Sequence, residues 1–147
     1  MSTAIGTSPH ENPLRVLLVD DSRFLRTACE RALLKAGYQV EIAVDGEEAL
    51  TLAAQTNYDL IILDMLLPKL SGVEVLRRLR SKPLTASVPV LVLSSLPESN
   101  REKLLTEGAT EYCEKSLLAG SNGQHAFLEA VQHLLLRVRK QICKTSG

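Results

Sequence analysis

Short apolar runs alternate with longer amphipathic segments along this chain. The runs are rich in Val, Ile and Leu and lie at 14–19, 38–44, 58–63, 88–93 and 109–113. Runs 14–19, 58–63 and 88–93 are nearly continuous, as is typical of strands that are covered on both faces. Run 38–44 alternates more and run 109–113 is weak, so we expect these two strands to lie at sheet edges or to be less buried.

The segments between the runs have helical spacing and recognisable start signals. Each of four residues can cap the N-terminus of a following helix. These residues are Ser22, Asp45, Ser71 and Ser121. The sequences "SGVE" and "SNGQ" are capping-box patterns at the third and fourth of these positions. Gly37 is expected to end the first helix, and residues 98–107 are expected to form a short polar helix.

Strand and helix therefore alternate five times. This alternation predicts an α/β fold in which a parallel sheet lies between two layers of helices. Right-handed crossovers leave few topologies for such a sheet. We expect a disordered tail at 1–13, one domain at 14–140 and a C-terminal tail at 141–147.

Composition narrows the classes of function. The chain has 147 residues with a formal net charge of zero, so nothing indicates a general attraction to nucleic acid or to a membrane. No apolar run approaches the ~20 residues that cross a bilayer. Cys29, Cys113 and Cys143 lack C-x-x-C spacing, which favours reduced thiols in a cytoplasmic protein.

Polar residues stand where four of the predicted strands end. Asp20 and Asp21 follow the first strand, Asp64 the third and Ser94 the fourth, and Lys115 comes shortly after the fifth. A single aspartate after a strand is often only a turn or cap residue. In an open parallel sheet, however, ligands bind beyond the carboxyl ends of the strands, where these side chains would converge. Clustered carboxylates repel one another unless a hard cation such as Mg²⁺ lies between them. The sequence therefore predicts a Mg²⁺-assisted phosphoryl site, with Mn²⁺ as an alternative cation.

Four motifs carry a resemblance to a known family. "LLVDDS", "DLIILDMLLPKLSG", "VLVLSS" and "GATEYCEKS" resemble, in this order, the motifs of the response-regulator receiver domain of two-component signalling. The resemblance covers about 14–140. It implies a flavodoxin-like (βα)5 three-layer sandwich with the strand order 2-1-3-4-5.

The resemblance also implies roles for the acidic residues. Asp64 would be the phosphoacceptor, phosphorylated by a sensor histidine kinase or a histidine phosphotransfer protein. Asp20, Asp21, Asp64 and the backbone carbonyl of Leu66 would hold the metal ion. The chain would then be a signalling receiver that takes part in its own phosphorylation and dephosphorylation, not an enzyme with a separate substrate.

Further residues would sense the phosphoryl group. Ser94 would hydrogen-bond it and Lys115 would pair with one of its oxygens. Ser94 and Tyr112 would act as the switch, with the tyrosine ring changing rotamer. The surface of the fourth helix, fifth strand and fifth helix would bind a downstream protein of unknown identity or a second copy of the chain. The candidate residues on this surface are Arg101, Lys103, Leu105, Glu107 and Glu111.

Two departures from the family pattern matter. Ser116 stands where the family usually has a proline joined to the lysine by a cis bond, and a cis bond before a non-proline residue costs ~2.5–4 kcal/mol. The approach of Lys115 to the phosphate is therefore an open question. Leu66 and Leu96 are apolar at positions that are often polar in the family. We expect them to exclude the attacking water and to slow self-dephosphorylation.

Two other classes of function stay open. One is a receiver-like scaffold that is never phosphorylated, which Ser116 favours and the complete set of aspartates opposes. The other is a small phosphatase with an aspartyl nucleophile. Such enzymes tend to place an acid two residues after the nucleophile, and this position is Leu66.

Overall fold

Five parallel strands form one sheet in the computed structural model, which describes residues 13–95, 101–118 and 122–146. The strands are β1 (Arg15–Val19), β2 (Gln39–Ala43), β3 (Leu60–Asp64), β4 (Val90–Ser94) and β5 (Glu111–Glu114). Their order is β2-β1-β3-β4-β5, which confirms the predicted order. No strand extends more than one residue past the apolar run that predicts it, so the periodicity located every strand.

Burial along each strand follows its place in the sheet. Every residue of β3 and β4 is buried, and β1 is buried from Val16 onward. At the two edges, β2 is fully buried only at Ala43 and β5 only at Cys113. The prediction that these two strands lie at the edges is confirmed, because only the central strands are covered on both faces.

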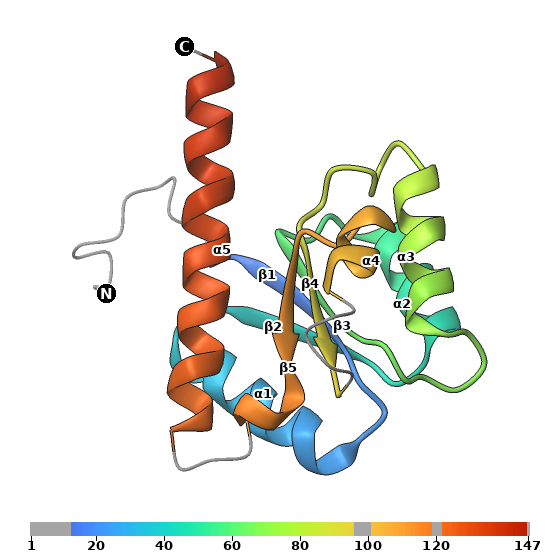
Figure 1. The fold of residues 1–147 in the computed structure, drawn as a ribbon, viewed down its shortest axis with the longest axis vertical. Coiled ribbons are helices and arrows are strands. Elements are labelled where there is room, and N and C mark those ends of the chain that lie inside the picture. The colour runs from blue at the N-terminus through green and yellow to red at the C-terminus, as the bar shows by residue number, and fades with distance from the viewer. Residues whose placement is uncertain (1–12, 96–100, 119–121, 147) are drawn as a thin grey trace.

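Helices cover both faces of the sheet (Figure 1). The bounds are α1 (Arg23–Lys35), α2 (Gly46–Gln55), α3 (Gly72–Ser81), α4 (Arg101–Thr106) and α5 (Gly123–Ser146). Apolar residues of α1 and α5 form the core on one face, and those of α2, α3 and α4 form the core on the other. A short 3-10 helix, η2 (Lys115–Leu118), follows β5. The predicted three-layer sandwich is therefore confirmed.

Three of the predicted capping residues lie at helix N-termini in the described residues, and two of them make the capping hydrogen bond. The side chains of Asp45 and Ser71 each accept the N–H of the residue three positions on, at 2.8 and 3.2 Å. Ser22 occupies the N-cap of α1, but its side chain makes no capping hydrogen bond. Its backbone N–H donates instead to the Asp20 carboxylate at 2.8 Å, so this turn holds the Asp20 side chain in place. The predicted cap Ser121 lies outside the described residues.

The helix ends differ from the sequence prediction in one respect. α1 ends at Lys35, and Gly37, the residue expected to end it, follows two positions later with a φ of 96°. Residues 98–100 of the predicted 98–107 helix lie outside the described residues, as do residues 1–12. α5 continues to Ser146, so residues 141–146 of the expected C-terminal tail are helical, and they extend beyond the sheet (Figure 1). Among the described residues, no helix combines the length and the apolar character that crossing a bilayer requires.

Candidate functional site

Three carboxylates meet where β1 and β3 end. Asp20 and Asp21 follow β1, and Asp64 is the last residue of β3, which pairs directly with β1. One carboxylate oxygen from each of the three lies within 4.8 Å of the other two. Asp20 and Asp64 are buried, whereas Asp21 is exposed. The predicted acidic cluster therefore forms, and it is open to solvent on the side of Asp21.

Hydrogen bonds fix the position of Asp20, but only one of its two carboxylate oxygens has a hydrogen-bond partner among the described residues. Its backbone N–H donates to the Ala43 carbonyl at 3.1 Å, and its Oδ1 accepts the Ser22 N–H at 2.8 Å. Its Oδ2 is buried and has no hydrogen-bond partner among the described residues. Burial raises the pKa of Asp20 to about 6; the charge of Asp64 adds to this effect, and the Ser22 N–H and Lys115 oppose it. A buried carboxylate oxygen of this kind calls for a positive partner.

Lys115 reaches the cluster from the far edge of the sheet. It is the first residue of η2, directly after β5, and its Nζ lies 2.7 Å from Asp64 Oδ1. The same oxygen accepts the Leu66 N–H at 3.1 Å. The peptide bond between Lys115 and Ser116 is trans, like every other bond in the described part of the chain. A serine in place of the proline therefore does not keep Lys115 from Asp64.

The loop between β3 and α3 bends sharply after Asp64. Lys69 has a φ of 68°, and the Pro68 carbonyl accepts the Leu70 N–H at 2.7 Å. This combination is a γ-turn with a positive central φ, which is a rare and strained conformation. The sequence showed no signal for it, because lysine is not a residue that favours this conformation.

The same loop returns close to its starting point. The Gly72 N–H donates to the Met65 carbonyl at 3.1 Å. A Cβ at Gly72 would lie 2.7 Å from the Asp64 carbonyl oxygen, so only glycine allows α3 to start this close to β3. The Leu66 side chain is 63% exposed, while its backbone N–H stays bonded to Asp64.

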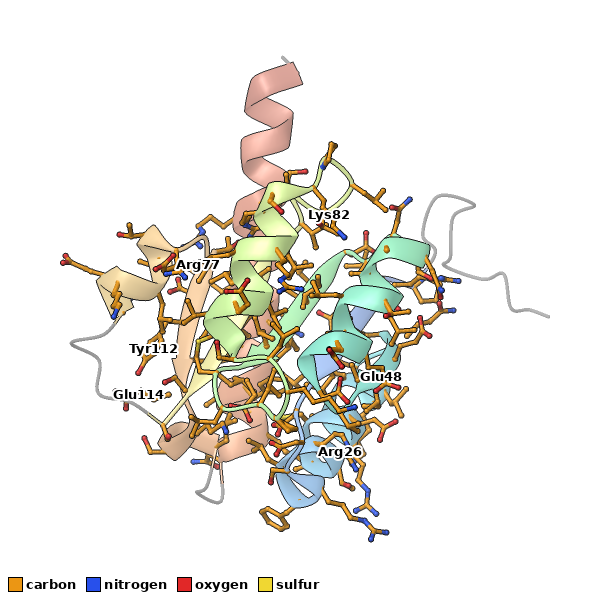
Figure 2. All side chains as sticks on the ribbon, turned by 90° about the vertical axis from the view of Figure 1, so that its right-hand side faces the viewer. Arg26, Glu48, Arg77, Lys82, Tyr112 and Glu114 are labelled. Carbon is orange, nitrogen blue, oxygen red and sulfur yellow. The ribbon has the colours of Figure 1, made fainter. Side chains whose placement is uncertain are left out.

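Ser94 and Tyr112 lie on neighbouring strands. Ser94 ends β4, is 1% exposed, and follows Leu93, the residue that pairs with Asp64. Tyr112 of β5 is partly buried against the core that α2, α3 and α4 cover. Figure 2 shows it at the edge of the sheet, below α4. Leu96 lies outside the described residues.

The acidic cluster fits a hard divalent cation. Mg²⁺ is bound in proteins by one or two carboxylates together with waters and phosphate oxygens. Three carboxylates converge here, and the Lys115 ammonium contacts only that of Asp64 in the described part of the chain. The unpartnered Oδ2 of Asp20 is the observation that fits a cation best, because a positive ion would offset the cost of its burial.

A second charged cluster lies along β5. The Glu111 carboxylate is 2.9 Å from a guanidinium nitrogen of Arg101 in α4 and 3.2 Å from one of Arg137 in α5. Burial pushes the pKa of Glu111 upward, but the Tyr112 N–H and the two guanidinium groups outweigh it and hold the pKa below its usual value. Glu107, by contrast, faces α3 and pairs with Arg77 at 2.7 Å.

A groove of about 800 Å³ runs between β5 and α5, beside Glu111. Sequence reasoning placed Arg101 and Glu111 on a candidate binding surface but missed Arg137. No local pattern links Glu111 to a residue 26 positions away in another helix.

Comparisons with known proteins agree with this architecture. A sequence profile of the response regulator receiver domain matches residues 16–121. The gliding motility regulatory protein of Myxococcus xanthus is 44% identical over 137 residues, which are 91% of this chain and 17% of that protein. Response regulator MprA of Mycobacterium sp. (strain KMS) is 38% identical over 135 residues, which are 91% of this chain and 53% of that protein. The chain thus spans about half or less of these curated relatives.

Solved structures show the same fold. The chemotaxis response regulator CheY4 of Vibrio cholerae has a TM-score of 0.76 at 30% identity, covering 84% of this chain and 99% of that one. The receiver domain of the sensor histidine kinase PA1611 from Pseudomonas aeruginosa PAO1 has a TM-score of 0.72 at 28% identity, covering 84% and 98%. That structure contains a magnesium ion coordinated in its active-site cleft. The matching profile, the shared fold and the acidic cluster together show that the chain belongs to the response regulator receiver domain family.

Proposed function

We propose that the chain is the phosphoacceptor of a two-component phosphorelay and that Asp64 takes the phosphoryl group from a phosphohistidine. The donor would be a sensor histidine kinase or a histidine phosphotransfer protein. The observation that carries the proposal is the setting of Asp64. It is buried, contacts Lys115 at 2.7 Å, and lies within 4.8 Å of two further carboxylates at the carboxyl end of the sheet.

The chemistry follows from these positions. An oxygen of the Asp64 carboxylate attacks phosphorus, the P–N bond to the imidazole breaks, and its electron pair stays on the nitrogen. The product is an acyl phosphate on Asp64. Asp20, Asp21, Asp64 and the Leu66 carbonyl would hold Mg²⁺, or Mn²⁺ in its place. Bound there, the ion would neutralise charge on the phosphoryl oxygens.

The neighbouring side chains complete the site. The Lys115 ammonium, which pairs with Asp64 before transfer, pairs with a phosphoryl oxygen afterwards. The Ser94 hydroxyl donates to another phosphoryl oxygen. A phosphate adds charge and strong acceptors, so it biases the position of the chain around Ser94.

We extend the proposal to the output of the domain. Movement at Ser94 is coupled to the rotamer of Tyr112, which lies beside the groove along β5. A downstream protein, or a second copy of the chain, binds the face of α4, β5 and α5 in response. The formal net charge of zero supports a cytoplasmic protein partner over nucleic acid or membrane.

Intact mass measurement tests the proposal. The protein is incubated with Mg²⁺ and a small phosphodonor such as phosphoramidate. We expect one phosphoryl adduct that is stable in acid and labile in base, and that is absent from Asp64→Asn. Asp59→Asn is the matched control, because Asp59 is an exposed aspartate just before the same strand.

Three outcomes would overturn the proposal. An adduct that persists in Asp64→Asn assigns the phosphate elsewhere. Consumption of the donor without a lasting adduct on the wild type indicates a small phosphatase. The absence of any adduct, with phosphohistidine donors as well, indicates a scaffold that is never phosphorylated.

A further inference from the structure

Lys69 stands at the most strained backbone position near the acidic cluster. It is the only non-glycine residue with positive φ in the described part of the chain, and it is the centre of the γ-turn between Pro68 and Leu70. Backbone strain of this kind persists only where the surroundings hold it in place. The contacts of Lys69 therefore indicate what holds the loop.

The Lys69 ammonium faces the start of α2. Its Nζ lies 3.4 Å from Asp45 Oδ2, and the Asp45 side chain is only 12% exposed. Asp45 Oδ1 accepts the Glu48 N–H at 2.8 Å, so one carboxylate both caps α2 and pairs with the loop. The Glu48 N–H and Lys69 together hold the pKa of Asp45 below its usual value, against a smaller opposing effect of burial.

The backbone beneath this pair is in close contact. A Cβ at Gly46 would lie 2.6 Å from Leu70 Cβ and 2.9 Å from the Leu70 carbonyl oxygen. The loop thus rests directly on the first residue of α2, and only a glycine there permits the approach. The ion pair and this contact fasten the same two segments.

Each fastened segment is also bonded to the acidic cluster. On the α2 side, the Ala43 carbonyl, two residues before Asp45, accepts the Asp20 N–H at 3.1 Å. On the loop side, the Leu66 N–H donates to Asp64 Oδ1 at 3.1 Å. The pair therefore connects the segment that holds Asp20 to the loop that follows Asp64.

We propose that Asp45 and Lys69 are positioning residues, which hold the β3–α3 loop and the Leu66 carbonyl in the arrangement that a divalent cation requires. This inference rests on the proposed function, in which that carbonyl is a metal ligand. Neither residue touches the ion or the reacting oxygen. Their effect is to lower the cost of ordering the loop when the cation binds.

The direction in which Mg²⁺ affinity changes on removal of Lys69 separates a positioning role from a purely electrostatic effect. Lys69 is positive, so its removal should tighten binding of a cation if charge acts only through space. If Lys69 positions the loop, its removal should weaken binding. Asparagine is the substitution to use, because it adopts positive φ more readily than lysine and adds no charge.

Calorimetric titration with Mg²⁺ alone tests the inference. We expect Lys69→Asn and Asp45→Asn each to weaken Mg²⁺ binding about two- to fivefold, the range for a partly exposed ion pair. Asp45→Asn keeps an N-cap acceptor for Glu48. The double variant should bind no more weakly than the weaker single variant, and Lys69→Arg should bind as the wild type does.

Two controls accompany the titration. Lys82→Asn makes the same change of charge at an exposed lysine directly after α3, well above Arg26 and Glu114 in Figure 2, and should leave binding unchanged. Thermal unfolding without Mg²⁺ should show Lys69→Asn to be close to the wild type in stability, since only a partly exposed ion pair is lost. A loss of binding without a loss of stability is the signature of positioning.

The outcomes are distinct. Unchanged or tighter Mg²⁺ binding in Lys69→Asn overturns the inference, and so does an additive double variant. Either result leaves the proposed function standing if wild-type Asp64 is phosphorylated. A wild-type protein that binds no Mg²⁺ at all would overturn both.

Discussion

Two charged clusters of the molecule differ in their balance of charge. Negative groups are in excess in the acidic cluster of Asp20, Asp21 and Asp64, and positive groups are in excess in the charged cluster around Glu111. In the first, three carboxylates converge, the Lys115 ammonium pairs with that of Asp64, and one buried oxygen of Asp20 has no partner among the described residues. In the second, one carboxylate is held by two guanidinium groups. Burial, with a smaller effect of the Asp64 charge, raises the pKa of Asp20, whereas the Tyr112 N–H and the two guanidinium groups outweigh burial and lower the pKa of Glu111.

The difference separates the proposed cation site from a cluster that links elements of the fold. Unsatisfied negative charge is costly in the protein alone and is relieved when a cation binds. The Glu111 carboxylate already has its charged partners, so it gains nothing from a bound cation. Its ion pairs instead link α4 and α5 to β5. Substitutions in the two clusters should therefore have opposite effects on stability without metal, and only those in the acidic cluster should change cation binding.

Asp20→Asn should produce the largest effect. We expect Mg²⁺ affinity to fall on the order of 100-fold, because a proposed ligand and its charge are lost. Without metal, however, the variant should be more stable than the wild type, since an amide can donate to Asp64 where a carboxylate repels it. Calorimetric titration and urea unfolding measure the two quantities. A variant that is less stable without metal would contradict the idea that Asp20 is held at a cost.

The pH dependence should come next in size. The pKa of Asp20 is about 6 when folded, against an ordinary 3.8, so the unfolded chain releases this proton first as pH rises. Its effect is therefore to lower the free energy of unfolding as pH increases through this range. We expect the stability difference between Asp20→Asn and wild type, without metal, to grow by about 1–2 kcal/mol from roughly pH 4 to 7, after a discount for screening at the open side.

Added Mg²⁺ should reverse this pH trend, because bound cation favours the ionised carboxylate. Urea unfolding of both proteins across the pH range, with and without Mg²⁺, provides the measurement. A stability difference that stays flat with pH would show that Asp20 has an ordinary pKa.

Glu111→Gln should act on stability alone. Two guanidinium groups lose their shared carboxylate, and we expect a loss of about 1–2 kcal/mol in the free energy of unfolding. Mg²⁺ affinity should stay unchanged. Glu129→Gln is the matched control, because Glu129 is an exposed carboxylate on α5, and it should change neither quantity. Weaker Mg²⁺ binding in Glu111→Gln would erase the distinction between the two clusters.

Leu66→Asn should have the smallest effect, confined to the lifetime of the phosphoryl group. Leu66 is 63% exposed and lies two residues after Asp64, where we propose that an apolar group excludes or misorients the attacking water. We expect the amide to shorten the half-life of phosphorylated Asp64 about 3- to 10-fold, on the order of 1 kcal/mol in the barrier. Loss of the adduct with time, followed by intact mass, measures this.

Leu84→Asn provides the comparison for Leu66. Leu84 is also an exposed leucine, 50% accessible, but it lies in the segment that follows α3. Equal half-lives in Leu66→Asn and in the wild type would remove any role for Leu66 in slowing water attack.

Much of the acidic cluster was predictable because its residues follow strands. Apolar runs locate β1 and β3, and each run ends at an aspartate, so a parallel sheet brings Asp20, Asp21 and Asp64 together. The helix starts at Asp45 and Ser71 were equally local. Ser22 was the exception, since its side chain gave no cap and its N–H was taken by Asp20.

Other features could not be obtained from neighbouring residues. The reach of Lys115 was in doubt because Ser116 replaces a proline, and the path of the chain after β5 decided it. The strained turn at Lys69 contradicts the local preference of lysine. Glu111 meets Arg137 only because β5 and α5 pack side by side.

By itself, the sequence determined where the strands begin and end, the layering of helices on a parallel sheet and the residues that gather at the carboxyl edge of the sheet, whereas the order of the strands was implied by the resemblance to the receiver family. These depend on periodicity, capping and the period of two in a strand, which act over a few residues. Only the tertiary structure decided which of the charged side chains find hydrogen-bond or ion-pair partners. That balance depends on burial and on charges from segments far apart in the chain, and it leaves one Asp20 oxygen unpartnered among the described residues while Glu111 has two partners.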